Sequence, residues 1–246
     1  MMKKQESLMS KFFSDDMLKM LYYHCCRVDF EDNNEKADLV KEILGPEFVE
    51  LGTGTNRITF LHKGLCCVIA LDRRGLVDNL TEYKRSIDAP EYFVKVYESN
   101  MLVCIEEYIT LMDKDEFVMN EAGIKEILLE LSKAYIFTDI GFTSKNYCNW
   151  GYRSNGDIVV LDLGYIYPIK GNENALSCPR CKAQIEYNSN YTSFKCSNNQ
   201  CKSLYSFMDI RRNMRLDMEQ MEDRMISELQ RVEMPNFDRF VENIHT

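Results

Sequence analysis

Four cysteines in two close pairs constrain this chain more than any other feature of its sequence. Two residues lie between Cys178 and Cys181, four lie between Cys196 and Cys201, and fourteen residues separate the pairs. Paired cysteines on turns can place four thiolates tetrahedrally around one Zn²⁺, which leaves no open coordination position. We therefore expect a structural zinc in a zinc ribbon, with residues 187–194 forming the connecting hairpin. The alternative is four free thiols, because the spacing of the second pair is wide.

The overall composition favours a cytoplasmic protein. The chain has 246 residues, ten cysteines and a net charge of −9. Its first residues contain no apolar run of signal-peptide length, so we expect reduced thiols rather than disulfides. No stretch of about 18 apolar residues occurs, so we expect no membrane span. The acidic balance argues against a protein built mainly to bind nucleic acid.

The predicted ribbon and the residues after it are nevertheless locally basic. The basic side chains are Arg180, Lys182, Lys195, Lys202, Arg211, Arg212 and Arg215. Tyr187, Tyr191 and Phe194 could stack bases, which makes this region a candidate for binding nucleic acid. We favour the alternative, in which the charges form a solvated face and the aromatic rings belong to the core.

A second informative stretch runs from Asn149 to Gly164. A turn at residues 154–157 joins two short apolar runs, which predicts a hairpin, and the second run ends at Asp162. Such a hairpin would bring the oxygen ligands of Asn149 and Asp162 to one place, as suits Mg²⁺ carrying nucleotide phosphates. The alternative is a surface hairpin that ends in an ordinary aspartate.

A third stretch predicts a glycine-bearing turn between strands. Strands are expected at 48–51, 58–61 and 65–71, and the turn reads Gly52-Thr53-Gly54-Thr55-Asn56-Arg57. Glycine lets a backbone approach a ligand closely, and successive N–H groups can cradle phosphates. A plain hairpin is again the alternative.

The order of these elements resembles that of a protein kinase. A helix over 76–87, two strands, a linker at 106–108 and a helix over 120–135 lie between the glycine turn and Asp162-Leu163-Gly164. This matches the kinase order of Gly-rich loop, small-lobe helix, hinge, catalytic loop and D-F-G motif. The runs GTNRI and KNYCNWGYR are also similar to uncharacterised kinase-like proteins of bacteriophages that infect Gram-positive bacteria. The resemblance covers residues 48–164, which is about half of the chain.

The resemblance implies binding of ATP and Mg²⁺ and transfer of a phosphoryl group, with a protein as substrate. The glycine turn would cover the phosphates, Asn149 and Asp162 would hold Mg²⁺, and Lys145 would stabilise the transferred group. Asp139 or Ser144 would lie nearest the acceptor. The linker at 106–108 would be the hinge, which offers only its backbone to the base, and the alternative for its two glutamates is a solvated linker. If the protein is phage-encoded, its compartment is the host cytoplasm.

Two departures from the kinase pattern favour an alternative. No lysine occurs in the third strand, so Arg57 or a later arginine would have to substitute, and Glu82 of the helix would pair with an arginine or be solvated. The position five residues before Asn149 holds Ser144 instead of the catalytic Asp. The chain could therefore be a catalytically inactive pseudokinase, a scaffold whose zinc ribbon and terminal helix bind a protein or nucleic acid.

The expected fold class is α+β, with a kinase-like small lobe and a truncated catalytic core. The predicted segments are a helical region (1–45), the kinase-like domain (46–175), the zinc ribbon (176–206) and a long amphipathic helix with a tail (207–246). Methionines recur along that helix at three- and four-residue steps, so it would pack on its own domain or dock a partner.

Overall fold

A computed structural model places the chain's helices and strands in two compact units. It describes residues 7–27, 33–137, 140–141, 146–170, 176–188, 193–206 and 209–210. The described residues of 7–88 and 95–108 form unit 1, and those of 89–94 and 109–210 form unit 2. The predicted boundaries near residues 45 and 175 fall inside these units. In the part of the chain that the structure describes, no helix is long and apolar enough to cross a membrane.

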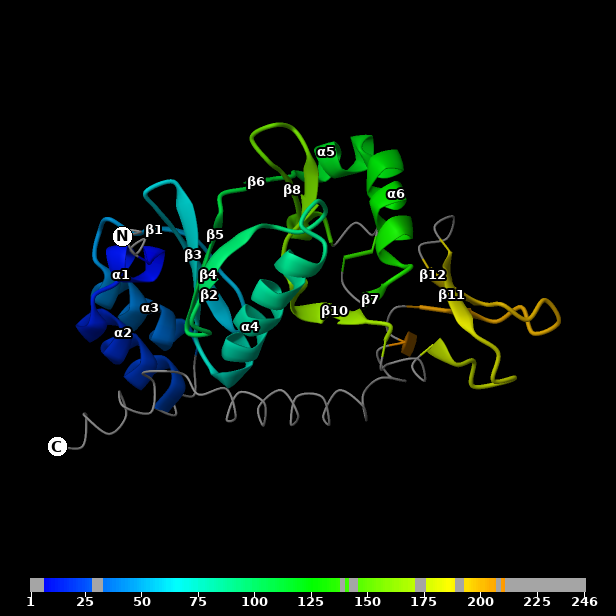
Figure 1. Cartoon of the computed structure of the whole chain (residues 1–246), viewed down its shortest axis with the longest axis horizontal. Coiled ribbons are helices and arrows are strands. Elements are labelled where there is room, and N and C mark those ends of the chain that lie inside the picture. Colours follow the sequence, from blue (N-terminus) through cyan, green and yellow to red (C-terminus); the bar gives the residue numbers. More distant parts are fainter. Residues whose placement is uncertain are drawn as a thin grey trace, which may run out of the picture. The chain divides into compact units, whose positions relative to one another are not determined.

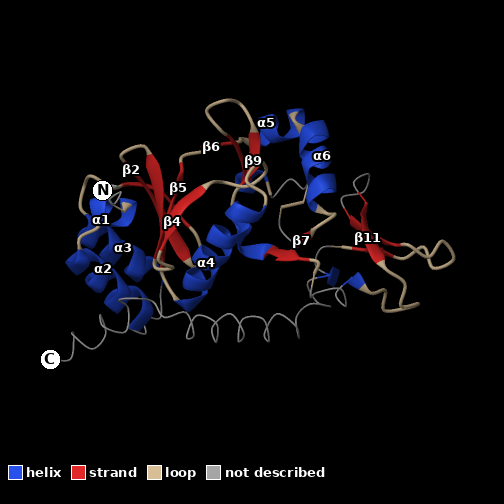
Figure 2. Ribbon diagram, viewed as in Figure 1, coloured by secondary structure: helices blue, strands red, loops and turns tan. Residues whose placement is uncertain are grey.

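Unit 1 is built on a five-stranded antiparallel sheet, which Figures 1 and 2 show beside the N-terminal helices. Its strands lie in the order β1-β2-β3-β5-β4. Their bounds are β1 (Val49–Thr53), β2 (Arg57–His62), β3 (Leu65–Ala70), β4 (Val96–Ser99) and β5 (Val103–Glu107). The strands predicted before and after the glycine turn are therefore confirmed.

Helices cover both faces of this sheet. They are α1 (Leu8–Phe12), α2 (Asp15–Tyr22), α3 (Asn33–Leu44) and α4 (Arg73–Asp88). The first three pack their apolar residues on the face that carries Phe60, Ile69 and Ile105. Side chains alternate along a strand, so Val68 and Cys104 point to the other face, where α4 packs.

Unit 2 contains two short helices and three small sheets. The helices are α5 (Lys114–Met119) and α6 (Glu121–Leu131). The sheets have the orders β6-β8-β9, β7-β10 and β11-β12-β13. Their strands are β6 (Thr110–Leu111), β7 (Tyr135–Phe137), β8 (Trp150–Tyr152), β9 (Ile158–Val160), β10 (Ile166–Pro168), β11 (Ile185–Asn188), β12 (Ser193–Cys196) and β13 (Leu204–Tyr205). The hairpin predicted between the cysteine pairs is β11–β12.

One core joins the sheets of unit 2. Trp150 and Phe137 are fully buried in it. The Phe137 ring lies 5.2 Å from the ring of Tyr187 and 6.3 Å from that of Phe194, so the cysteine-bearing sheet shares this core. The segment that follows α4 also belongs here, because Arg153 donates hydrogen bonds to the carbonyls of Pro90, Glu91 and Phe93.

Close packing at Gly151 yields a test of the β6–β8 contact. A Cβ at this position would meet Ile109 and would lie 2.6 Å from the carbonyl oxygen of Thr110, which is backbone and cannot move aside. We expect Gly151→Ala to lower the free energy of unfolding by about 1–3 kcal/mol. Urea unfolding followed by the fluorescence of Trp150, the only tryptophan, measures this in unit 2.

Gly123→Ala is the matched control. A Cβ on Gly123, inside α6, would meet only the Ile158 Cδ1 atom at 3.7 Å, an ordinary contact. Alanine should be neutral there or should stabilise the helix by about 0.5–1 kcal/mol. Equal stabilities of the two variants would contradict the close approach of β6 and β8.

Candidate nucleotide and metal sites

The glycine turn between β1 and β2 is exposed yet anchored within unit 1. Gly54 donates its N–H to the carbonyl of Arg57 at 2.8 Å, and Leu71 donates to the carbonyl of Asn56 at 2.8 Å. The Asn33 amide, at the start of α3, donates to the carbonyl of Thr55. The predicted phosphate-binding residues therefore lie on one turn, whose backbone is held from both sides.

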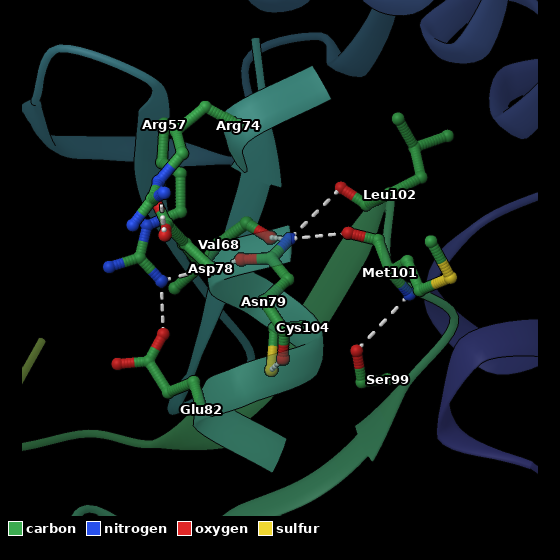
Figure 3. Close-up of polar contacts among 10 residues, drawn as sticks. All are labelled: Arg57, Val68, Arg74, Asp78, Asn79, Glu82, Ser99, Met101, Leu102 and Cys104. Carbon is green, nitrogen blue, oxygen red and sulfur yellow. Dashed lines mark hydrogen bonds and ion pairs between the residues drawn. The ribbon is translucent and has the colours of Figure 1, made fainter. Parts of the chain in front are cut away.

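Arg57, the first residue of β2, has a largely buried side chain that pairs with a carboxylate of α4. Its guanidinium forms an ion pair with Glu82 of α4, and the two side chains are only 14% and 3% exposed. The Asn79 Oδ1 atom lies 3.4 Å from the same guanidinium nitrogen, as Figure 3 shows. The expectation that Glu82 pairs with an arginine is confirmed, and its solvated alternative is wrong.

Asn79 fastens α4 to the sheet, a role that the sequence analysis missed. Its side-chain amide donates to the carbonyls of Val68, Met101 and Leu102 at 3.3, 2.7 and 3.3 Å (Figure 3). Asn79 is fully buried, and it lies three residues before Glu82, hence on the same helix face. The sequence signal for this role is a polar residue three positions before Glu82, on the helix face that is expected to be buried.

Glu106, at the end of β5, is buried rather than part of a solvated linker. The solvated alternative is therefore wrong for Glu106: the residue is 6% exposed, and its Oε1 atom has no hydrogen-bond partner among the described residues. Burial raises the pKa of this carboxyl well above its ordinary range, the charge of Glu82 raises it further, and Arg57 opposes the shift. Strand alternation places Glu106 on the face of Cys104, toward α4.

The hairpin of unit 2 brings Asn149 close to Asp162. Strands β8 and β9 pair with Trp150 opposite Val160, and the Leu161 N–H donates to the Asn149 carbonyl at 2.8 Å. The predicted hairpin is confirmed. Asp162 follows with φ of 49°, a left-handed conformation that costs free energy in a non-glycine residue and often marks functional sites. Both predicted ligands are half-buried.

Several predicted residues cannot be assigned to these sites. Asp139, Ser144 and Lys145 lie outside the described residues, as does nearly all of the predicted terminal helix. The glycine turn belongs to unit 1, whereas Asn149 and Asp162 belong to unit 2. The predicted phosphate-binding turn and the predicted Mg²⁺ ligands are therefore two separate structural features, one in each unit.

The four predicted metal ligands do come together in unit 2. The sulfurs of Cys178, Cys181, Cys196 and Cys201 all lie within 4.8 Å of one another. Two of the separations are 3.8 and 3.4 Å. Four sulfurs at about 2.3 Å from a tetrahedral zinc would lie about 3.8 Å apart, so the cluster could hold a metal ion such as zinc.

Two hydroxyl groups contact this cluster, and the sequence analysis did not identify them. The Tyr205 hydroxyl lies 2.9 Å from the Cys178 sulfur and lowers the pKa of that thiol to about 6. The Ser203 hydroxyl lies 3.2 Å from the Cys201 sulfur and lowers its pKa as well. Burial instead raises the pKa of Cys196 to about 12. Ser203 could have been noticed from its place two residues after a ligand, whereas Tyr205 depends on the pairing of β13.

The two described aromatic residues that were candidates for stacking bases pack into the core of unit 2. Phe194 is buried and Tyr187 is half-buried, and both pack on Phe137. The favoured expectation, that these rings belong to the core, is therefore confirmed for Phe194 and Tyr187, whereas Tyr191 lies outside the described residues. The exposed basic side chains nearby are Arg180, Lys182, Lys195 and Lys202.

Burial of Glu106 predicts a pH dependence of stability. The folded chain keeps the Glu106 proton at pH values above 4.5, the ordinary pKa at which the unfolded chain releases it. The unfolded state then binds fewer protons, so the free energy of unfolding falls as pH rises, by up to about 1.4 kcal/mol per pH unit. Glu106→Gln, which cannot ionise, should lose this component. Chemical unfolding followed by circular dichroism from about pH 5 to pH 8 compares the two. If the free energies of unfolding of the wild type and of Glu106→Gln change with pH in parallel, the raised pKa of Glu106 is contradicted.

Comparisons with known proteins were made for the whole chain. No model of a protein family matches it, and no curated protein matches it significantly in sequence. What the sites bind is therefore inferred from their own chemistry: an anchored glycine turn beside a buried ion pair, a hairpin carrying two oxygen ligands, and a cluster of four thiols.

Proposed function

We propose that the chain is a divergent kinase-like protein that binds ATP with Mg²⁺, carries a structural zinc, and transfers a phosphoryl group to a protein. The observation that carries the proposal is the buried Arg57–Glu82 pair beside the glycine turn. A cation fixed at this place can meet phosphate charge, and the exposed turn can offer its backbone N–H groups.

The topology of unit 1 supports the same proposal. The sheet order β1-β2-β3-β5-β4, with α4 between β3 and β4 in the chain, is the order expected of a kinase-like small lobe. Arg57 comes from β2 rather than from β3, so the cation approaches α4 from the strand that follows the glycine turn. An arginine also offers a planar, bidentate donor set for phosphate oxygens, which a lysine lacks.

Asn149 and Asp162 are the residues that would hold Mg²⁺. Their oxygens suit this hard cation, and they flank the two ends of one hairpin. The bound ion would neutralise phosphate charge. The protein's own contribution is to fix the two ligands through strand pairing.

Zinc is the metal that best fits the four-thiol cluster. Four thiolates at these separations match tetrahedral Zn²⁺, and a site without an open position serves structure. A bound zinc would cross-link the turn before β11 to the end of β12 and to the turn before β13 through the four cysteines.

A scaffold without catalytic activity is the second candidate. The specific observation in its favour is that β3 holds only apolar residues from Val68 to Ala70, all buried. In this reading the fold is kept, and the cysteine-bearing sheet or the terminal segment binds a protein or nucleic acid.

ATP binding tests the nucleotide site, and phosphoryl transfer then separates an active enzyme from an inactive scaffold. Titration calorimetry with ATP and Mg²⁺ should show binding that requires Mg²⁺ and that weakens at least about tenfold in Asp162→Ala and in Arg57→Gln. Arg57→Lys keeps the charge and should retain part of the affinity, which guards against a folding defect in Arg57→Gln. With the label on the γ- or the α-phosphate, transfer assays then separate phosphoryl from nucleotidyl transfer.

Arg85→Gln is the matched control for Arg57. Arg85 also lies in unit 1 and forms an ion pair, but its partner is Asp88 at the exposed end of α4. Its loss should leave ATP affinity unchanged. A folded wild-type chain that binds no ATP would refute the nucleotide proposal and leave the scaffold.

Metal analysis tests the zinc proposal. We expect purified protein to hold about one zinc per chain by plasma mass spectrometry, and Cys178→Ser and Cys201→Ser to lose it because three ligands do not close the site. Cys148→Ser is the control, since this cysteine is exposed and lies outside the cluster. Wild-type metal content in Cys178→Ser would contradict the assignment.

A further inference from the structure

The four sulfurs of the cysteine cluster differ in their access to solvent. Cys178 and Cys196 are fully buried, whereas Cys181 and Cys201 are half-buried. A reagent from solvent therefore meets the partly exposed residues Cys181 and Cys201 before it meets the two buried cysteines.

The same sulfurs differ in their hydrogen-bond donors. The hydroxyls of Tyr205 and Ser203 lie 2.9 and 3.2 Å from the sulfurs of Cys178 and Cys201, and a metal-bound thiolate can only accept from them. Within the described ranges, no hydroxyl reaches Cys181 or Cys196, whose sulfurs are 3.4 Å from each other. Hydrogen bonds to a metal-bound thiolate disperse its charge and so reduce its reactivity toward electrophiles.

These two properties divide the cluster in different ways. Cys178 has a hydroxyl donor and is buried, Cys196 lacks the donor but is buried, and Cys201 is accessible but has the donor. Within the part of the chain that the structure describes, Cys181 is the one ligand that is partly exposed and has no hydroxyl donor.

We propose that Cys181 is the site at which soft carbon electrophiles modify this protein, and that its modification opens the metal site. This inference rests on the proposed metal. The Cys181 sulfur forms a bond to carbon, the leaving group departs as an anion, and the resulting thioether is a poor zinc ligand. No oxidant or reductant is needed.

The local backbone agrees with this reactivity. Cys181 is followed by Lys182, which has a positive φ of 62°, and both Arg180 and Lys182 are exposed. Cys181 thus lies on a turn between two exposed basic residues, which agrees with its partial exposure.

Mapped alkylation tests the proposal. Zinc-loaded full-length protein is treated with limiting iodoacetamide, quenched, digested and analysed by mass spectrometry, while a chromogenic indicator follows zinc release. We expect Cys181 to be labelled about fivefold faster than each of the other three ligands, with zinc released at the same rate. The exposed Cys148 serves as an internal reference for the reagent.

Ser203→Ala provides a second, independent outcome. It removes the hydroxyl from the half-buried Cys201, whose labelling should rise toward that of Cys181. Ser197→Ala, in the same loop region but without a contact to a ligand sulfur among the described residues, should change nothing.

The results separate the inference from the metal proposal. If zinc is bound but Cys201, Cys196 or Cys178 is labelled first, or Ser203→Ala leaves Cys201 unchanged, the inference is overturned alone. If no zinc is bound and a chelator does not alter the labelling pattern, the metal proposal fails with it.

Discussion

The buried pair of Arg57 and Glu82 is the interaction on which the architecture of unit 1 depends. It joins β2 to α4 in a place from which water is largely excluded, and Asn79 adds bonds from the same helix to three backbone carbonyls. Loss of one partner would leave an uncompensated buried charge, which typically costs about 3–5 kcal/mol. The position of the helix and the orientation of the cation are thus set together.

A second carboxyl makes this cluster more than a simple ion pair. Glu106 lies beside Glu82, so one guanidinium serves two acids, and the raised pKa of Glu106 relieves the excess negative charge. In its neutral form Glu106 does not compete with Glu82 for the Arg57 guanidinium. Protonation of Glu106 and the position of the Arg57 guanidinium near the glycine turn are therefore linked through Glu82.

Unit 2 relies on a different kind of constraint. Its three sheets are small, and two strands, β6 and β13, have only two residues each. Close packing at Gly151, the anchored segment at Arg153 and the four-cysteine cluster compensate for the short ladders. Strand β13 has two roles: it pairs with β12, and its residue Tyr205 places a hydroxyl beside the sulfur of Cys178.

The sequence by itself determined what depends on near neighbours in the chain. The hairpin between Asn149 and Asp162 and the cysteine pairs follow from turn residues and spacing, which act within a few positions. Only the tertiary structure decided which arginine pairs with Glu82 and that Glu106 is buried. Those outcomes depend on strand register and on the packing of α4 against strands that are distant in the sequence. A local sequence pattern does not predict which residue a long side chain contacts.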